Sequence, residues 1–388
     1  MPAQNTPLSG GVFFAIMYIN IDSRVITMKK LTAFYVTLLV LATLMPSCSC
    51  RKQSEYTWHS EVMTDYFDTL ITIVAYTKTQ DEFDAYFRQA EERFAQLHKL
   101  YDIYKNYEGI NNLKTVNDNA GLEPVAVNKD LLDLVKLAKE WTLSGHEKTN
   151  ITLGPVLKIW HEYRTEGLYN PEKSQLPPRE ELEAVAKFAD AQKIIIDEQV
   201  CTIYLQEKGM SLDVGAVAKG YATELVVREL EAAGLVSGAI SAGGNVRTIG
   251  QPLDGVRDRW GIGIFNPDSP VFSEDRNLDV VYINDASVVS SGDYQRYYYV
   301  QGVRYHHLVD PATLMPARFY RAVTVVTSDS GRADLLSTEF FLLPYEESRQ
   351  LAESLDDVEV LWIMPDGEIK VTEGMAKLLR SYGASGKD

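Results

Sequence analysis

Cysteine and histidine are scarce in this sequence. Its 388 residues include only 3 cysteines and 6 histidines. So few thiols cannot form a disulfide framework, so a packed apolar core must stabilise the fold. The hydrophobic fraction of 45% is sufficient for such a core. No group of cysteines and histidines has the spacing of a structural zinc site.

Basic residues are outnumbered, since 38 lysines and arginines stand against 54 aspartates and glutamates. The net charge of -16 argues against a nucleic-acid-binding surface, which requires a basic face. We therefore expect no nucleic-acid partner. An anionic small-molecule substrate is still compatible with this charge, because a local cationic pocket can form in an acidic protein.

Several common fingerprints are also missing. The sequence contains no GxGxxG, no GxxxxGK[ST] and no GxSxG. It therefore gives no support for a Rossmann dinucleotide site, a P-loop or the nucleophile elbow of an α/β-hydrolase. The chain also has no internal repeat and no low-complexity tract.

The N-terminal region has the pattern of a signal peptide. Two lysines follow Met28, and residues 31–45 are then fifteen residues without a charge. This apolar run is too short for a comfortable membrane span, but it has the length of a signal-peptide core. A cysteine directly after such a core resembles a bacterial lipoprotein cleavage site, so we expect Cys48 to be lipidated, with Cys50 as the alternative. An ordinary secretory signal and a short anchor helix stay open.

The rest of the chain divides into a tether and one domain. We expect an N-terminal extension and signal peptide over residues 1–47, a polar tether over 48–60 and a domain over 61–388. In the domain, runs of strand are interrupted by helices without a clean linker, which predicts an α+β fold with two lobes, a mixed or antiparallel sheet and inserted helices. Predicted strands are 67–76, 193–196, 201–205, 237–241, 246–250, 260–265, 278–283, 287–290, 297–303, 305–309, 321–327, 358–364 and 368–371. Predicted helices are 82–100, 129–144, one that starts near Pro155, 180–190, 217–233, 331–343 and 346–354.

Residues 211–224 are the most informative stretch of the domain. They are predicted to form the end of a strand at Asp213, a tight turn at Gly215 and the start of a helix that carries Lys219. A helix N-terminus with free N–H groups, a lysine and a carboxylate can bind a phosphate and a metal ion. Many strand-to-helix turns with a glycine and a lysine bind nothing, so both interpretations stay open.

Two further groups of residues have the chemistry of a site. Asp334 and Thr338 lie four residues apart, so they share one face of a helix and could ligate a hard cation through oxygen, or simply cap the helix. His306 and His307 point to opposite faces of a strand, so one of them could face a cleft and act as a base, while a structural histidine is the alternative. The aromatic turn at 290–298 could hold a flavin or nucleotide ring, or be an exposed strand end.

Five blocks occur in order along the domain, and together they resemble the ApbE family of flavin transferases (FAD:protein FMN transferases). The resemblance extends over about residues 61–380. The blocks are 67–73 (FDTLITI), 149–155 (TNITLGP), 212–221 (LDVGAVAKGY) with 243–245 (GGN) behind it, 290–294 (SSGDY) with 307–311 (HLVDP), and 333–338 (ADLLST).

The resemblance implies a reaction and a set of site residues. Such enzymes use Mg²⁺, cleave FAD, release AMP and join FMN through a phosphoester to a threonine or serine of a target flavoprotein. Matched to the family motifs, the metal ligands are the backbone oxygen of Ala216 with Asp334 and Thr338. The FAD-binding residues are Tyr104, Thr152, Leu153, Gly154, Asp213, Lys219 and the backbone near Val309, and His307 is the base for the acceptor hydroxyl.

Other functions stay open beside this one. A hydrolase of the same fold would split FAD into FMN and AMP for flavin salvage, and a lipoprotein could bind flavin without turnover. A lipoprotein signal is common in the family, so we expect a membrane-anchored protein that faces the periplasm. Three positions depart from the usual family pattern: Asp68 and Leu314 stand where glycine is usual, and Glu224 stands where aspartate is common.

Overall fold

The computed structural model describes residues 55–269 and 276–387. The predicted signal peptide over 1–47 and the predicted lipidation sites at Cys48 and Cys50 lie outside these residues. None of the described helices is both long enough and apolar enough to cross a membrane.

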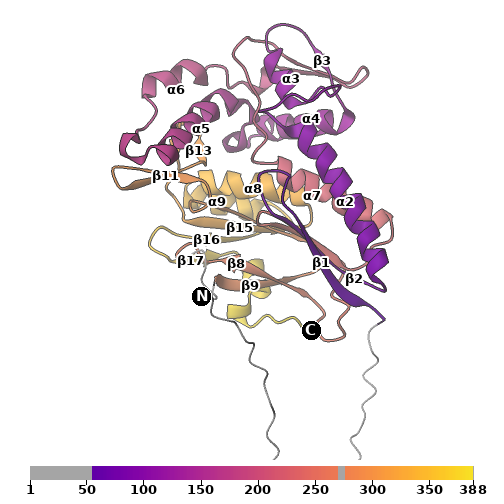
Figure 1. Cartoon of the computed structure of the whole chain (residues 1–388). Helices are drawn as coiled ribbons and strands as arrows, with labels where there is room; N and C mark the ends of the chain where they lie inside the picture. Colours follow the sequence, from indigo (N-terminus) through magenta and orange to yellow (C-terminus); the bar gives the residue numbers. More distant parts are fainter. Residues whose placement is uncertain (1–54, 270–275, 388) are drawn as a thin grey trace, which may run out of the picture. The chain divides into compact units, whose positions relative to one another are not determined.

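An eight-stranded antiparallel sheet is the centre of the fold (Figure 1). All its neighbouring strands run antiparallel. This arrangement confirms the predicted α+β class. In sheet order the strands are β1 (Thr57–Met63), β2 (Ile71–Thr77), β6 (Gly238–Ala242), β7 (Asn245–Ile249), β10 (Ser287–Gly292), β15 (Ala322–Thr327), β16 (Glu359–Ile363) and β17 (Ile369–Val371).

Both faces of the sheet are covered, as strand β15 shows. All six of its residues are buried. Val323 and Val325 pack into a core with helices α8 and α9, whereas Ala322 and Val326 pack into a second core with β8, β9 and α10. Figure 1 shows the helices above the sheet and the β8–β9 hairpin below it. The bounds are α8 Ser330–Leu342, α9 Tyr345–Ser354, β8 Trp260–Phe265, β9 Asn277–Ile283 and α10 Glu373–Leu378.

Helices α2 (Gln80–Tyr101) and α7 (Ala218–Ala232) complete the helical layer. The buried face of α2 carries Phe83, Phe87 and Phe94, which join β2, β6 and α7 in the largest apolar core. The helix starts earlier than predicted because Thr79 caps it, accepting a hydrogen bond from the Glu82 N–H at 3.2 Å. The predicted helices at α2 and α7 are otherwise confirmed.

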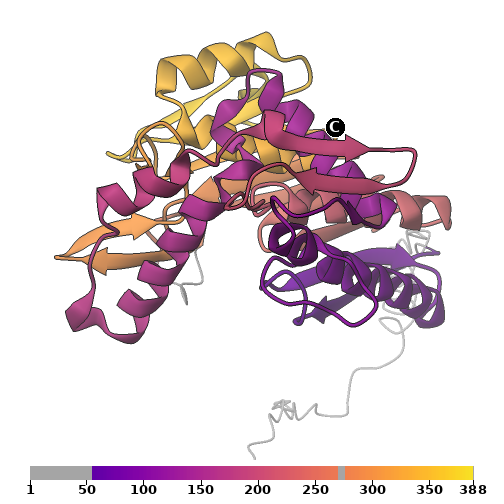
Figure 2. The ribbon, with the colours of Figure 1, turned by 90° about the horizontal axis from the view of Figure 1, so that it is seen from above.

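A second part of the domain lies above this helical layer (Figures 1 and 2). It has a small core of its own, which includes Trp160, Leu182 and Tyr298. Figure 2 shows α5, α6 and the β11–β12 hairpin on one side and α2 with α3 on the other. The bounds are α3 Leu113–Asp118, β3 Val125–Ala126, α4 Lys129–Leu143, α5 Gly154–Tyr169, α6 Arg179–Ala186, β4 Ile194–Asp197, β5 Thr202–Leu205, β11 Tyr297–Val300, β12 Val303–His306, β13 Val309–Asp310 and β14 Met315–Pro316. Short 3₁₀ helices are η1 (Glu147–Thr149), η2 (Ile151–Leu153), η3 (Pro171–Lys173), η4 (Ala191–Lys193) and η5 (Arg380–Tyr382).

Some of the predicted elements were wrong. Residues 57–60, predicted as the end of the tether, form the first half of β1 because they pair with β2. No strand ends at Asp213; its N–H donates instead to the Ile151 carbonyl at 2.8 Å. The segment 101–125, predicted as loop, contains α3, which begins at a capping box between Asn112 and Thr115.

The three departures from the family pattern each have a structural counterpart. Asp68 and Leu314 have φ of +50° and +60°, the left-handed region that glycine adopts most readily. Their turns therefore keep the backbone shape of a glycine turn. Glu224 accepts hydrogen bonds from Ser330 N at 2.9 Å and Arg247 Nε at 3.2 Å, so it links α7 to the start of α8 and to β7.

Candidate functional site

The site is built where the start of α7 meets α8. A Cβ atom added to Gly220 would lie 2.2 Å from the Ser330 carbonyl oxygen and 2.6 Å from Asp334 Cβ. Only glycine therefore allows the two helices to approach this closely. At this contact the Gly220 N–H donates to Asp334 Oδ2 at 2.8 Å, and the carboxylate of Asp334 is 5% exposed.

This hydrogen bond changes the first turn of α7. In a regular helix the N–H of Gly220 would donate to the carbonyl oxygen four residues earlier, on Ala216. Here Asp334 takes that donor, and across the described chain no backbone N–H bonds to the Ala216 oxygen. The carbonyl oxygen of Ala216 is thus free to accept a ligand.

Thr338 lies one turn after Asp334 on α8 and is 8% exposed. Its hydroxyl is 3.4 Å from the hydroxyl of Ser291 on β10, which also contacts Ser337 at 2.9 Å. A carboxylate, a hydroxyl and a carbonyl oxygen are ligands that suit Mg²⁺ better than a soft metal. Within the described residues, no group of three or more His, Cys, Asp or Glu offers another metal site. The predicted metal ligands thus fit the ion.

Lys219 supplies the positive charge nearest to Asp334. Its Nζ lies 3.8 Å from Asp334 Oδ2 and donates to the Gly215 carbonyl at 3.3 Å. Desolvation raises the pKa of Asp334, while Lys219 and the Gly220 N–H oppose this rise. Desolvation outweighs these partners, so the buried carboxylate would be stabilised further by a bound cation.

Hydrogen bonds fix both the side chain of Asp213 and the backbone of the residue before it. The Gly215 N–H donates to Asp213 Oδ1 at 2.8 Å. The preceding residue, Leu212, is clamped by the Asn117 amide, which accepts from its N–H at 2.7 Å and donates to its carbonyl at 2.9 Å. Desolvation raises the pKa of Asp213, and the Gly215 hydrogen bond and the charges of Arg296 and Lys219 oppose this rise. No sequence pattern indicated the role of Asn117, because no helix or strand was predicted in the segment 101–125.

The turn Thr152-Leu153-Gly154 offers its backbone rather than its side chains. Thr152 and Leu153 are buried, and the Thr152 hydroxyl and N–H both donate to Asn150 Oδ1, at 2.6 and 2.9 Å. A Cβ on Gly154 would lie 2.4 Å from the Ser211 carbonyl oxygen, so the start of α5 packs directly against the chain before Asp213. The two predicted FAD-binding segments are therefore neighbours.

His306 and His307 differ in their hydrogen bonding, and β12 ends at His306, so strand alternation does not extend to His307. His306 is buried, with Nε2 donating to the Ala317 carbonyl at 2.6 Å and Nδ1 accepting from the Leu308 N–H at 3.2 Å. His307 has a buried Nδ1 with no hydrogen-bond partner. Desolvation lowers the pKa of His307 well below its usual value, and nearby cations, chiefly Arg296, lower it further. His307 is thus a neutral imidazole with an available nitrogen.

Val309 is the first residue of β13. Its side chain is buried, so only its backbone is available to a ligand. The next residue, Asp310, pairs with Lys148 Nζ at 2.7 Å. The adjacent Thr149 donates from its N–H and hydroxyl to Glu339 on α8, at 2.8 and 2.6 Å. These bonds connect β13 and η1 to the helix that carries Asp334.

Tyr104 lies at the mouth of the site with three residues that the sequence did not single out. Its side chain is 57% exposed, and its ring centroid is 5.5 Å from that of His161 on α5. His161 Nδ1 accepts a hydrogen bond from Arg164 Nη2 at 2.9 Å. The charges of Arg164 and Arg296 both act on Tyr104. The only sequence signal was the three-residue spacing of His161 and Arg164, which puts them on one helix face.

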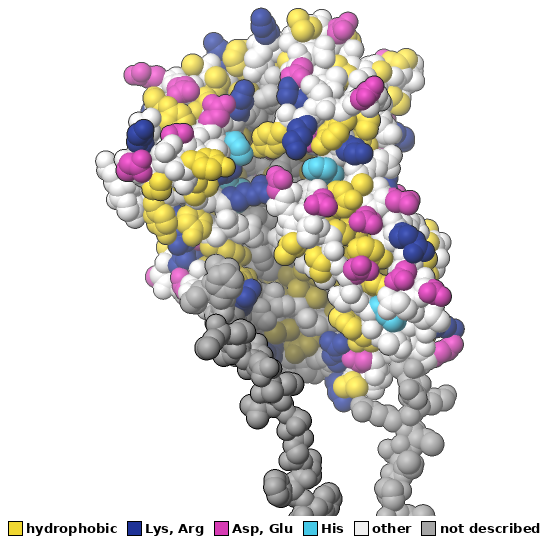
Figure 3. All heavy atoms as spheres, viewed as in Figure 1, with side chains coloured by type: hydrophobic (Ala, Val, Ile, Leu, Met, Phe, Trp, Pro, Cys, Tyr) yellow, Lys and Arg dark blue, Asp and Glu magenta, His cyan; other side chains and the backbone are white. Residues whose placement is uncertain are grey.

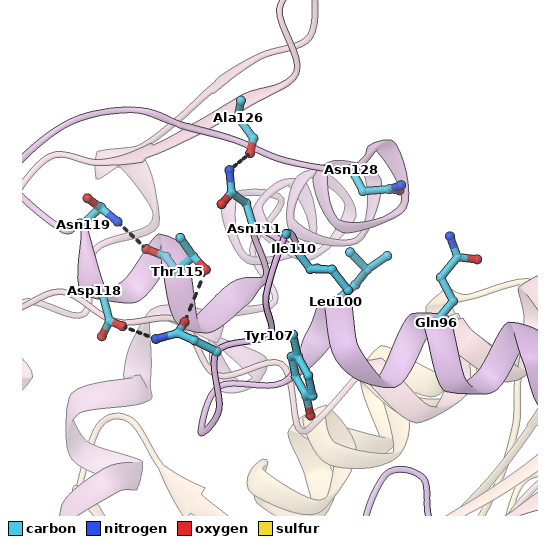
Figure 4. A pocket seen from close by; sticks show the side chains of 12 residues that line it. Gln96, Leu100, Tyr107, Ile110, Asn111, Thr115, Asp118, Asn119, Ala126 and Asn128 are labelled. Carbon is cyan, nitrogen blue, oxygen red and sulfur yellow. Dashed lines mark hydrogen bonds between the residues drawn. The ribbon is translucent and has the colours of Figure 1, made fainter.

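Figure 3 shows a hollow between the α5–α6 part and the α2–α3 part, with Lys, Arg and His side chains at its rim. A different cavity, of about 710 Å³, lies at the α3 end of the domain and contains none of the predicted site residues (Figure 4). Its amides already have partners: Asn111 donates to Ala126 O at 2.8 Å and Asn119 to Thr115 O at 2.8 Å. That cavity therefore offers few free groups for a ligand.

Comparisons with known proteins agree with this geometry. The model of the ApbE family matches residues 67–362. The chain is similar to the FAD:protein FMN transferase of Klebsiella pneumoniae (strain 342), with 29% identity over 280 residues, 70% of this chain and 83% of the relative. It is similar to that of Treponema pallidum (strain Nichols), with 29% identity over 316 residues, 76% of this chain and 84% of the relative. The crystal structure of the ApbE protein of Thermotoga maritima superposes with a TM-score of 0.72 and 26% identity, covering 83% of this chain and 99% of that one.

Proposed function

The chain belongs to the ApbE family, and on that premise we propose that it transfers FMN from FAD to a target protein. The proposed acceptor group is a threonine or serine hydroxyl, the proposed metal ion is Mg²⁺ and the proposed leaving group is AMP. One observation carries the proposal: the Gly220 N–H bonds to the buried carboxylate of Asp334 and so leaves the Ala216 carbonyl oxygen free.

The residues of the site would bind the metal ion and FAD in separate roles. When bound, Mg²⁺ would neutralise charge on the pyrophosphate. Ala216, Asp334 and Thr338 would hold the ion, and Lys219 would contribute a fixed positive charge beside it. The 152–154 turn and Asp213 would hold FAD, chiefly through backbone groups, and Tyr104 would line the entrance.

His307 would accept the proton of the acceptor hydroxyl. Its Nδ1 is unpaired, and its lowered pKa keeps the imidazole neutral near pH 7. The hydroxyl oxygen then forms a bond to the phosphorus of the FMN half. The bond from that phosphorus to the bridging oxygen breaks, and AMP leaves with its electron pair.

Product analysis with and without an acceptor tests this proposal. We expect a peptide of the pattern Asp-x-x-Ser/Thr-Gly-Ala/Ser-Thr to gain FMN in the presence of FAD and Mg²⁺, with one AMP released for each adduct. Rapid metal-dependent AMP release without any adduct would identify an FAD pyrophosphatase instead. FAD binding without either product would identify a flavin-binding protein.

The metal assignment has its own matched pair of variants. Asp334→Asn removes the buried charge, so Mg²⁺-dependent turnover should fall at least a hundredfold while FAD still binds. Asp356→Asn makes the same change at an exposed residue on the surface and should leave turnover unaltered. Unchanged turnover in Asp334→Asn would refute the metal site.

We also propose that the protein is anchored to the membrane by a lipid on Cys48 and faces the periplasm. The support is the apolar run over 31–45 followed by a cysteine. Mass spectrometry of the N-terminal peptide from membranes tests it: a diacylated cysteine is expected, and an unmodified peptide that begins after an ordinary cleavage site would contradict it.

A further inference from the structure

Two arginines in the cleft lack acidic partners. Arg164, on α5, makes its side-chain hydrogen bond to the neutral acceptor His161 Nδ1 at 2.9 Å. Arg296 lies in the turn between β10 and β11. Across residues 55–269 and 276–387, neither guanidinium forms an ion pair, whereas most other arginines do. In a protein with a net charge of -16, such a pair requires an explanation.

Tight packing brings the two arginines together. A Cβ added to Gly167 on α5 would lie 2.6 Å from the ring of Tyr298 on β11, so the helix and the strand are in direct contact. Arg164 is three residues before Gly167, and Arg296 is two residues before Tyr298. The Ser174 hydroxyl bond to the Tyr299 carbonyl at 2.6 Å holds the same strand against the end of α5.

The convergence of these charges is unfavourable without a ligand. Burial and the charge of Arg296 both lower the pKa of Arg164, while Tyr104, Tyr298 and Asp213 oppose this shift. Arg164 is half-buried and Arg296 is exposed, and a partly buried cation is normally compensated by a carboxylate because burial disfavours an unpaired charge. An anion bound between the arginines would remove this penalty.

We propose that Arg164 and Arg296 bind the pyrophosphate of the dinucleotide substrate. This inference rests on the proposed function, from which the substrate is taken. Lys219 stands beside Asp334, and its charge acts on His307 together with those of Arg164 and Arg296. Two linked phosphates can bridge them, and the planar fork of arginine matches phosphate oxygens in a bidentate manner.

The electrostatics of the neighbouring groups agree with this assignment. The charges of Arg164 and Arg296 act on His307, and that of Arg296 also acts on Asp213. The cleft thus holds three cations against the two carboxylates Asp213 and Asp334, even before a metal ion is counted. A dianionic pyrophosphate has the charge that such a cleft requires.

Equilibrium binding of three flavins tests the proposal without turnover. FAD, FMN and riboflavin carry a pyrophosphate, a single phosphate and no phosphate. Arg296→Gln and Arg164→Gln should each weaken FAD binding about tenfold or more, as for the loss of a charged hydrogen bond. FMN affinity should fall less, and riboflavin affinity should not change. Inorganic pyrophosphate should compete with FAD on the wild type and poorly on either variant.

Controls separate a binding role from a structural one. Arg88→Gln removes the same charge from an exposed position on α2 and should leave all three affinities unchanged. Arg164→Lys keeps the charge but not the fork, so it should retain only part of the FAD affinity. The melting temperature of each variant shows whether it folds. A variant with the melting temperature of the wild type reports on binding and not on folding.

Several results would overturn the inference. An equal loss of riboflavin and FAD affinity would mean that the arginines shape the flavin site. Unchanged FAD affinity with a raised acceptor KM would assign them to the target protein. The proposed function fails separately: if the wild type binds FAD through these arginines but never forms an FMN adduct, the pyrophosphate subsite stands and the transferase does not.

Discussion

At the residue scale, the site depends on the hydrogen bond from the Gly220 N–H to Asp334 Oδ2, which no sequence motif indicates. The spacing of Asp334 and Thr338 predicted a shared helix face, and residues 212–221 predicted a glycine turn before a helix. The sequence could not show that Gly220 N–H bonds to Asp334, because that contact joins residues 114 positions apart. The free Ala216 oxygen follows from this tertiary contact alone.

Gly220→Ala should therefore damage both stability and activity. The added methyl group meets backbone and side-chain atoms at 2.2–2.8 Å, so α7 must move away from α8. We expect a loss of about 1–3 kcal/mol in the free energy of unfolding, measured by urea denaturation, and a large loss of metal-dependent turnover. Gly331→Ala is the matched control at the same junction, where the nearest atoms are 3.3 Å away and the effect should be much smaller. Equal effects of the two changes would contradict this account.

Asp68→Gly is expected to act in the opposite direction. Asp68 has a φ of +50°, which costs an L-residue about 1 kcal/mol relative to glycine. The substitution should raise the free energy of unfolding by up to about 1 kcal/mol, although glycine also gains freedom in the unfolded chain. Asp68→Ala keeps the strain and serves as the control. A stabilisation of the alanine variant as large as that of the glycine variant would show that backbone strain is not the cause.

At the element scale, strand alternation was the most reliable guide. It predicted that His306 and His307 would face opposite ways; at the end of β12 His306 is buried, and the next residue, His307, leaves its Nδ1 without a hydrogen-bond partner. Alternation could not reveal that α5 and β11 bring Arg164 and Arg296 together, since that depends on how Gly167 packs on Tyr298. It also missed α3, whose Asn117 clamps Leu212, because a six-residue helix has too little periodicity to detect.

The β12 element predicts how stability depends on pH. Burial lowers the pKa of His306, so the unfolded chain binds a proton that the folded chain excludes. Stability from this residue is present above about pH 6.5, the pKa of an unfolded histidine, and is lost as the pH falls towards the folded pKa. Each pH unit in that window should cost at most about 1.4 kcal/mol.

Urea unfolding between pH 5 and pH 8 measures this dependence. His306→Gln should be less stable overall but should show a shallower fall in stability below pH 6.5, because glutamine does not titrate. His98→Gln, at a partly exposed position on α2, is the comparison variant. If wild type and His306→Gln lose stability with the same slope, the buried histidine is not the group responsible.

At the scale of the whole molecule, composition and order of elements predicted the α+β class and two lobes, because apolar periodicity reports which faces are buried. They did not predict the strand order β1-β2-β6-β7-β10-β15-β16-β17, in which β6 and β7 lie between strands from both ends of the chain. That order brings the α7 turn, the α8 helix and the His307 segment to one side of the sheet. The tether prediction was wrong over 57–60 for a related reason, since β1 is fixed only by its pairing with β2.

The most direct measurement is the intact mass of an acceptor peptide after incubation with the protein, FAD and Mg²⁺. We predict one FMN adduct on the threonine or serine of the peptide, absent when Mg²⁺ is chelated and absent with Asp334→Asn. A peptide of unchanged mass with the folded, FAD-binding wild type at every metal concentration would contradict the account.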